Sequence, residues 1–127
     1  MNRFKDKVVI VTGAGSGIGA GTARRFLQEG AFVVLNGRRE EKLHETIAGF
    51  DAAQSLIHPG DVSDEEYVKR LVEDTIAKFG KLDVLVNNAG ISSAGELFRR
   101  SLLLFFPAPP RPRPQGRWAD RLSVLSG

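Results

Sequence analysis

The sequence predicts an α/β fold: a doubly wound parallel sheet, truncated at about four strands and followed by an irregular C-terminal tail. Three observations lead to this prediction. Short apolar runs rich in β-branched residues alternate with longer segments of helical periodicity, a pattern typical of parallel strands joined by right-handed crossover helices. A glycine-dense turn follows the first apolar run, and the composition changes abruptly near residue 96.

The first unit of strand, turn and helix is expected within residues 7–30. Residues 7–12 form a continuous β-branched run, which is typical of a strand buried on both faces. Apolar residues then recur at helical spacing until Gly30, which is placed to end the helix. The apolar face of this helix is predicted to consist of Ile18, Ala23, Phe26 and Leu27.

Two further strands flank a polar helix. The second strand is expected at residues 32–36, and the polar helix runs from Glu40 to about Ala48. Residues 55–58 have the weaker pattern of a third strand, which Pro59 interrupts.

The third helix carries the clearest signals. Ser63 and Glu66 have the spacing of a capping box, which predicts that the helix starts there. Gly80 ends the helix, and residues 82–87 supply the fourth strand. The apolar face of the helix is predicted to contain Val68, Leu71, Val72, Thr75, Ile76 and Phe79.

Residues 12–19 read TGAGSGIG and lie between the first strand and its helix. In one half of a Rossmann-like sheet, such a turn directs unpaired backbone N–H groups and the helix dipole at one spot, which suits a pyrophosphate. Gly13 permits the tight turn, Gly17 leaves room for the phosphates, and Gly19 allows close packing of helix and strand. We therefore predict nucleotide binding, with a purely structural turn as the alternative.

The end of the second strand indicates which nucleotide binds. An NAD site carries an acidic residue about 20 residues beyond the glycines, which accepts hydrogen bonds from the ribose 2′-OH. This sequence has Gly37 there, followed by Arg38 and Arg39, and a guanidinium can pair with the 2′-phosphate of NADP. The hypothesis is a preference for NADP over NAD, with Arg38 as the main contact. Alternatively, both arginines are solvated residues that open a helix.

Together these residues resemble the short-chain dehydrogenase/reductase family. The resemblance rests on TGAGSGIG, on the pair Asp61-Val62 after the third strand, and on NNAG at residues 87–90 after the fourth strand. It covers roughly residues 5–95, and three motifs in order at strand ends are more specific than any one of them. The resemblance implies a Rossmann-like fold and an NAD(P)-dependent oxidoreductase.

The resemblance also implies roles for individual residues. The glycine turn would contact the pyrophosphate and the adenosine ribose, Asp61 would accept a hydrogen bond from the adenine amino group, and Val62 would flank the ring. Residues 88–90 would line the ribose beside the nicotinamide, and Asn87 would steady the sheet. Without the resemblance, Asp61 and the two asparagines are ordinary turn and strand-end residues. The predicted cofactor-binding residues are Gly13, Ala14, Gly15, Ser16, Gly17, Ile18, Gly19, Arg38, Arg39, Asp61, Val62, Asn88, Ala89 and Gly90.

Family members transfer hydride between the nicotinamide and a carbonyl or alcohol, using the Tyr and Lys of a Y-x-x-x-K motif and a Ser. The single tyrosine of this chain, Tyr67, is followed four residues later by Leu71, and we interpret it as a partly exposed helix residue. No serine has the required setting. We predict no catalytic residue, and we expect the chain as given to lack hydride-transfer activity.

Residues 96–127 differ in composition from residues 1–95. They hold five of the six prolines, and six arginines against Glu96 and Asp120. We predict an NADP-binding half-domain at 1–95 and a disordered or frameshift-derived tail at 96–127. A frameshift with an early stop, a natural or truncated module with a partner-adapted tail, and a proline-rich ligand for a peptide-binding domain are the three interpretations. The alternative function is accordingly a non-catalytic nucleotide-binding or partner-binding fragment.

Composition narrows the remaining possibilities. The net charge of +3 resides in the tail, so nucleic-acid binding is not predicted. There is no cysteine, no apolar stretch of about 20 residues and no signal segment, so we expect a cytoplasmic protein without membrane contact. His44 and His58 lack the spacing of metal ligands or of a triad, and we interpret them as surface or strand-end residues. In the family the substrate is a small carbonyl or alcohol. Family members form homo-oligomers, and this assembly is doubtful for the present chain.

Overall fold

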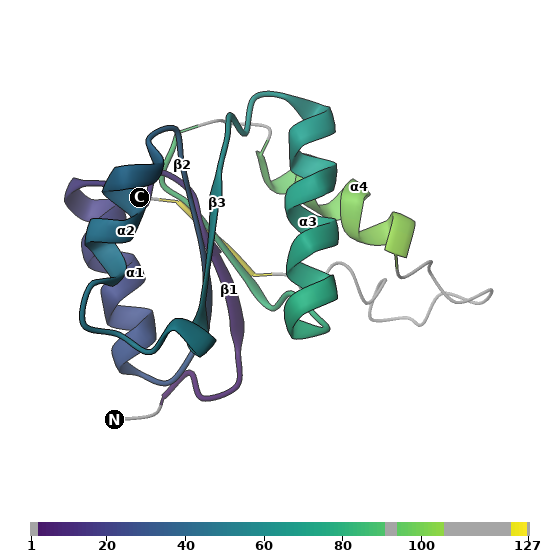
Figure 1. Ribbon diagram of the computed structural model, residues 1–127. Coiled ribbons are helices and arrows are strands. Elements are labelled where there is room, and N and C mark those ends of the chain that lie inside the picture. Colours follow the sequence, from purple (N-terminus) through teal and green to yellow (C-terminus); the bar gives the residue numbers. More distant parts are fainter. Residues whose placement is uncertain (1–2, 91–93, 106–122, 127) are drawn as a thin grey trace.

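A five-stranded parallel sheet forms the centre of the molecule (Figure 1). The computed structural model describes residues 3–90, 94–105 and 123–126. Within these residues the strands lie in the order β3-β2-β1-β4-β5, and every neighbouring pair is parallel. Their bounds are Val8–Val11 for β1, Phe32–Gly37 for β2, Ser55–Pro59 for β3, Val84–Asn87 for β4 and Ser123–Ser126 for β5.

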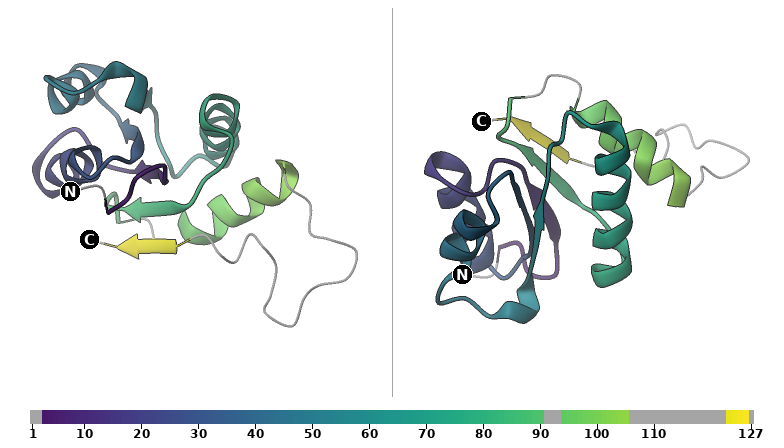
Figure 2. Two further views of the ribbon diagram at one scale, coloured as in Figure 1. Left: turned by 90° about the horizontal axis from the view of Figure 1, so that it is seen from below. Right: turned by 45° about the horizontal axis from the view of Figure 1, so that its top comes forward.

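Helices cover both faces of the sheet. The helices α1 and α2 lie on one face, and α3 and α4 lie on the other, as two further views show (Figure 2). Their bounds are Gly17–Gln28 for α1, Glu40–Ile47 for α2, Glu65–Phe79 for α3 and Ala94–Phe105 for α4, with a short 3-10 turn at Ala52–Gln54. The predicted fold class, a doubly wound Rossmann-like sheet, is confirmed.

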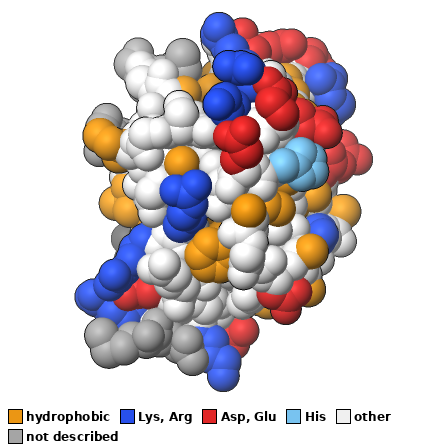
Figure 3. All heavy atoms as spheres, turned by 60° about the vertical axis from the view of Figure 1, so that its left-hand side comes forward, with side chains coloured by type: hydrophobic (Ala, Val, Ile, Leu, Met, Phe, Trp, Pro, Cys, Tyr) orange, Lys and Arg blue, Asp and Glu red, His pale blue; other side chains and the backbone are white. Residues whose placement is uncertain are grey.

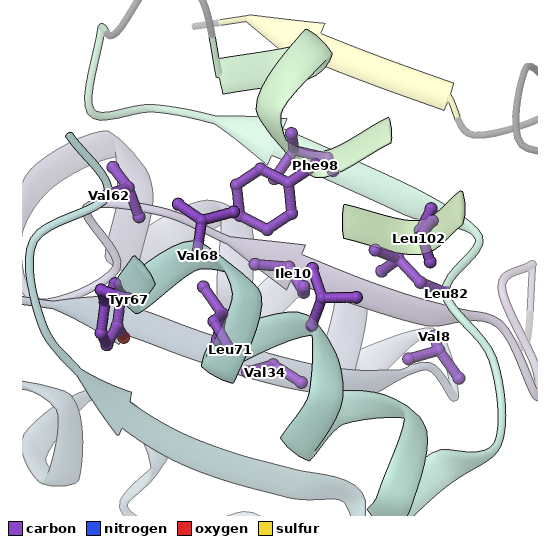
Figure 4. Close-up of a cluster of buried hydrophobic side chains, with 12 residues drawn as sticks. Val8, Ile10, Val34, Val62, Tyr67, Val68, Leu71, Leu82, Phe98 and Leu102 are labelled. Atoms are coloured by element: carbon purple, nitrogen blue, oxygen red, sulfur yellow. The ribbon is translucent and has the colours of Figure 1, made fainter. Parts of the chain in front are cut away.

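Successive side chains of a strand point to opposite faces of the sheet, so an apolar core forms on each face. Val8 and Ile10 of β1 point toward α3 and α4, whereas Val9 and Val11 point toward α1 and α2. All four side chains are buried, because a central parallel strand is covered on both sides. Figure 4 shows the core on the α3 side, where Phe98 of α4 lies beside Val68 of α3 and above the sheet.

The C-terminal region contributes more structure than the sequence predicted. The expected count of about four strands is one short, because β5 pairs along the whole of β4, from Val84 opposite Ser123 to Asn87 opposite Ser126. The helix α4 crosses the predicted boundary at residue 95, and Phe98 and Leu102 are fully buried in the core. The proline-rich residues 107–114 lie outside the described residues, so the division into a half-domain and a tail stays a prediction.

Three local expectations are corrected. Ile18 is 74% exposed, because it lies off the buried face of α1, which consists of Gly19, Ala20, Ala23, Phe26 and Leu27. The capping box is wrong: the helix α3 begins at Glu65, and its N-cap is Asp64, whose side chain accepts the Glu66 N–H at 3.0 Å. Pro59 belongs to β3, at the last position of the strand. In the described part of the chain, no helix is both long and apolar enough to cross a membrane.

Candidate nucleotide-binding site

The carboxyl ends of four strands converge on one edge of the sheet. Gly13 lies two residues beyond β1, Gly37 is the last residue of β2, and Gly60 and Ala89 follow β3 and β4. The strand order reverses at β1, since the chain first builds outward to β2 and β3 and then returns to place β4 on the other side. Ligands of open α/β sheets bind in the crevice at such a switch point.

The glycine turn has the backbone geometry that its sequence predicts. Gly13 and Gly17 have φ angles of 62° and 57°, which side-chain-bearing residues rarely adopt. Gly19 packs so tightly against the turn that an added Cβ would lie 1.9 Å from the Gly13 carbonyl oxygen. Gly17, by contrast, faces open space. The helix therefore packs closely under the turn and leaves the side above Gly17 accessible.

Two hydroxyl groups hold the turn against its neighbours. The Thr12 oxygen accepts hydrogen bonds from the Asn88 and Ala89 backbone N–H groups at 2.9 and 3.0 Å, which ties the turn to the segment after β4. The Thr46 hydroxyl of α2 donates to the Ala14 carbonyl at 2.9 Å. Both threonines are buried, so the turn is fixed from the β4 side and from the α2 side.

The first turn of α1 is suited to an anion. Its N-cap, Ser16, makes no side-chain capping bond, and the first turn contains no acidic residue. The first N–H groups of a helix have no partner within the helix, and the helix dipole places partial positive charge there. A phosphate would supply the missing acceptors, so this terminus fits the pyrophosphate of a dinucleotide.

A cavity of about 320 Å³ extends from the glycine turn to the end of β2. Three of its seven lining residues are cations and none is a carboxylate. Its lining residues are Gly13, Gly15, Ser16, Gly37, Arg38, Arg39 and Lys42. A second cavity of about 220 Å³ shares Gly13, Gly37 and Arg38 with the first, so the two form one groove. The second cavity is lined further by Asn36, Gly60, Asp61, Val62 and Ala89.

Charged side chains meet where the two cavities join. The Arg38 guanidinium lies 3.7 Å from Asp61 Oδ2, and both side chains are largely exposed. Arg39 pairs with Glu41 at 2.9 Å. Hydrogen bonds from the Ser63 hydroxyl and backbone N–H lower the pKa of Asp61 from its ordinary value, and Arg38 adds to this effect. Asp61 is therefore an ionised acceptor at neutral pH.

On the face that carries α1 and α2, Lys and Arg side chains lie beside Asp and Glu side chains (Figure 3).

Most of the predicted cofactor-binding residues come together at this groove. Eight of them line it: Gly13, Gly15, Ser16, Arg38, Arg39, Asp61, Val62 and Ala89. The other six do not. Ala14 is buried, Gly19 packs beneath the turn, Gly17 and Ile18 are exposed at the start of α1, and Asn88 and Gly90 follow β4.

Sequence reasoning missed Asn36, Gly60 and Lys42, which also line the groove. Lys42 could have been found, because it lies three residues beyond Arg39, the N-cap of α2, and so about one helical turn further along the chain. Asn36 and Gly60 have no such signal, since each looks like an ordinary strand-end residue.

Tyr67 and His58 differ from their interpretation. Tyr67 is 5% exposed, not a partly exposed residue, because its ring packs into the core under α3 (Figure 4). His58 lies at the end of β3 as expected, but it does not stand alone. Its Nδ1 lies 2.8 Å from the Tyr67 hydroxyl and its Nε2 lies 2.7 Å from the Asp74 carboxylate. His44 is exposed and lies 3.4 Å from Glu40.

The buried Tyr67 hydroxyl should lose its proton at a higher pH than an exposed tyrosine. Burial raises the pKa of Tyr67 from 10.0 to about 12, against the hydrogen bond from Asn36 and the charge of Arg70. A folded-state pKa above the unfolded value means that this stability is fully present below pH 10 and is lost as the pH rises through 12. The loss amounts to about 2–3 kcal/mol.

Absorbance of the tyrosinate measures this directly, because the chain has a single tyrosine. We expect the native chain to ionise near pH 12 and the urea-unfolded chain near pH 10. Equal midpoints in the two states would show that the phenol is not buried in solution.

A parallel sheet of this order, with a glycine turn at its switch point, defines a dinucleotide-binding type of α/β protein. Comparison with known sequences gives the family. The model of the short chain dehydrogenases matches residues 7–101, and the chain belongs to the short-chain dehydrogenase/reductase family. Members of this family are oxidoreductases that bind nicotinamide dinucleotides. The matched region ends at residue 101, includes the first two thirds of α4 and so extends beyond residue 95.

Curated relatives and solved structures agree with this assignment. Glucose 1-dehydrogenase of Gluconobacter oxydans is 51% identical over 92 residues, covering 70% of this chain and 35% of the relative. Meso-2,3-butanediol dehydrogenase of Serratia marcescens is 40% identical over 100 residues, covering 79% of this chain and 40% of the relative. The crystal structure of 3-ketoacyl-(acyl-carrier-protein) reductase from Brucella melitensis, complexed with NADH, has a TM-score of 0.70 at 33% identity, covering 80% of this chain and 51% of that one. The chain thus spans well under half the length of these two curated relatives.

Proposed function

We propose that this chain forms the NADP-binding part of a short-chain oxidoreductase that transfers hydride to or from a carbonyl or alcohol. The observation that carries the preference for NADP is the cavity beside the glycine turn, where Arg38, Arg39 and Lys42 converge. A ribose bound at the end of β2 would place its 2′-substituent among these cations. A phosphate is favoured there, because three positive charges and no carboxylate line the cavity.

Different residues of the groove would bind different parts of the cofactor. The α1 N-terminus and the backbone after Gly13 would bind the pyrophosphate, and Arg38 would leave its long contact with Asp61 to pair with the 2′-phosphate. Asp61 and Val62 would bind the adenine, and residues 88–90 would lie along the second ribose. When bound, the nicotinamide supplies or accepts the hydride. NAD is the competing choice, because the solved reductase from Brucella melitensis is complexed with NADH.

The chain lacks the catalytic pair that such a reaction uses in the family. The Y-x-x-x-K pair that family members use does not occur in these 127 residues. Tyr67 cannot replace it, because its hydroxyl is buried under α3 and engaged with His58. We therefore propose that the chain as given binds the cofactor without turning it over.

Replacing Arg38 by aspartate tests the cofactor preference. The substitution removes a guanidinium and adds a carboxylate that repels the 2′-phosphate and can accept from a ribose 2′-OH. We expect the affinity for NADPH to fall by roughly 100-fold, while the affinity for NADH stays the same or rises. Fluorescence titration of both cofactors with the native chain and the variant measures the ratio.

Arg100→Asp is the matched control, because it makes the same charge change at an exposed position of α4 that lines neither cavity. It should leave the ratio within about threefold of the native value, since exposed charges at a distance are screened by salt. An unchanged preference in Arg38→Asp would refute the proposed preference for NADP.

A further inference from the structure

A cluster of polar side chains lies directly behind the second cavity. It consists of Asn36 from β2, His58 from β3, and Tyr67 and Asp74 from α3, and we call it the Tyr67 cluster. The Ala14 N–H of the glycine turn donates to the Asn36 carbonyl at 2.8 Å, and the Arg70 guanidinium lies over the Tyr67 ring, 5.8 Å from its centroid. The cluster reaches the groove through Asn36, which lines the cavity together with Gly60 and Asp61.

The Asn36 amide is the link between the cluster and the groove. Its nitrogen lies 3.0 Å from the Tyr67 hydroxyl, 3.1 Å from the Gly60 carbonyl and 3.3 Å from the His58 carbonyl. Asn36 is 2% exposed, so losing these bonds would leave a buried amide without water to replace them. The carbonyl of Gly60 is thereby held at a fixed place one residue before Asp61.

The Tyr67 ring fixes the same segment from below. Gly60 has a φ angle of 154°, and an added Cβ would lie 2.0 Å from the Tyr67 ring. The Tyr67 hydroxyl donates to the His58 carbonyl at 2.6 Å, and the His58 ring reaches Asp74 on the same helix. The end of β3 and the loop at Gly60 and Asp61 therefore rest on a ring that is anchored to β2, β3 and α3.

The path of this loop decides where the Asp61 carboxylate lies. One oxygen, Oδ1, accepts from the Ser63 N–H at 2.9 Å and from the Ser63 hydroxyl at 2.7 Å. The other, Oδ2, faces Arg38 at 3.7 Å across the groove. Only Oδ2 is thus directed to a ligand, and a shift of the loop would move it out of reach.

We propose that Asn36 and Tyr67 are positioning residues that make the site selective for adenine, by holding Asp61 where its free oxygen can accept from the exocyclic amino group of the base. This inference rests on the proposed function. It adds that base selectivity depends on a buried tyrosine and asparagine that need not touch the cofactor base. The selectivity for the 2′-phosphate, in contrast, depends on Arg38, which lines both cavities, and on Arg39 and Lys42 of the first cavity.

The test compares the binding of NADPH with that of its hypoxanthine analogue, which lacks the amino group. The full 127-residue chain is used, and dissociation constants are measured by calorimetry. We expect the native chain to bind NADPH roughly tenfold or more tightly than the analogue, because the carboxylate would otherwise lose a charged hydrogen bond. In Tyr67→Phe, which removes only the hydroxyl, this ratio should fall below about threefold.

Thr75→Val is the matched control. Thr75 is a fully buried residue of α3 whose hydroxyl donates to the Leu71 carbonyl, so its loss also removes one buried hydrogen bond from this helix. A merely structural effect would lower the stability of both variants and leave the base ratio unchanged. If Tyr67→Phe does not fold, Asn36→Ala makes the same test, since it removes the amide and keeps the phenol.

The outcomes separate the two proposals. A tenfold preference in the native chain and in Thr75→Val that is lost in the cluster variant supports the inference. The inference is overturned if the cluster variant keeps the native preference for NADPH over the analogue, or if the native chain binds NADPH without such a preference. In either case the proposed cofactor site is unaffected. Failure of the native chain to bind NADPH overturns both.

Discussion

Replacing Gly19 by alanine is expected to weaken cofactor binding strongly and to destabilise the fold. The new methyl group would lie 1.9 Å from the Gly13 carbonyl oxygen and 2.8 Å from its carbon, so the backbone of the turn itself must move. Overpacking of this kind costs about 1–3 kcal/mol and sometimes more. The displaced N–H groups would also lose two or three hydrogen bonds to phosphate, which corresponds to roughly 100-fold in affinity.

Gly21→Ala provides the control on the same helix. Gly21 is exposed, and an added Cβ meets nothing within 4 Å. The helix should therefore gain about 0.5–1 kcal/mol from the lower backbone entropy of alanine, and NADPH should bind as to the native chain. Urea denaturation and cofactor titration of the two variants give the comparison. Similar behaviour of the two would show that α1 does not pack closely on the turn.

Phe98→Ala should be the most destabilising single truncation in α4. The ring is fully buried between α3 and the sheet (Figure 4). Removal of a buried phenylalanine costs about 3–5 kcal/mol, because apolar surface is lost and a cavity remains. The denaturation midpoint should therefore fall steeply, and for a chain of this size the variant should be close to unfolding.

Leu104→Ala distinguishes packing from helix propensity. Leu104 lies in the same helix but is 64% exposed, so its loss should change the free energy of unfolding by no more than about 0.5 kcal/mol. A large difference between the two variants means that α4 is part of the folded unit. If both variants unfold at the native midpoint, residues 96–105 do not contribute to the core, and the predicted division at residue 95 is supported.

The local patterns of the sequence predicted most of the first ninety residues. The strand β2 and the helix α2 begin where predicted, and α3 ends at Gly80 as its pattern indicated. These successes share a cause: apolar periodicity and glycine caps act over a few residues, so they can be read without knowing the partner. The glycine turn was predictable for the same reason, since its function requires a local backbone geometry.

Two of the errors concern residues at the starts of helices. Asp64 and not Ser63 is the N-cap of α3, because the Ser63 hydroxyl donates its hydrogen bond to Asp61. Ile18 was assigned to the core face, but it precedes Ala23 by five residues and lies off the buried face of α1.

By itself, the sequence determined the parallel α/β class, the glycine turn, the basic end of β2 and the family resemblance. The tertiary structure alone decided the pairing of β5 with β4 and the Tyr67 cluster. The pairing joins Val84 to Ser123, and the cluster joins Asn36 to Tyr67. Contacts between residues this far apart in the chain form only when the sheet brings them together, so no local pattern records them.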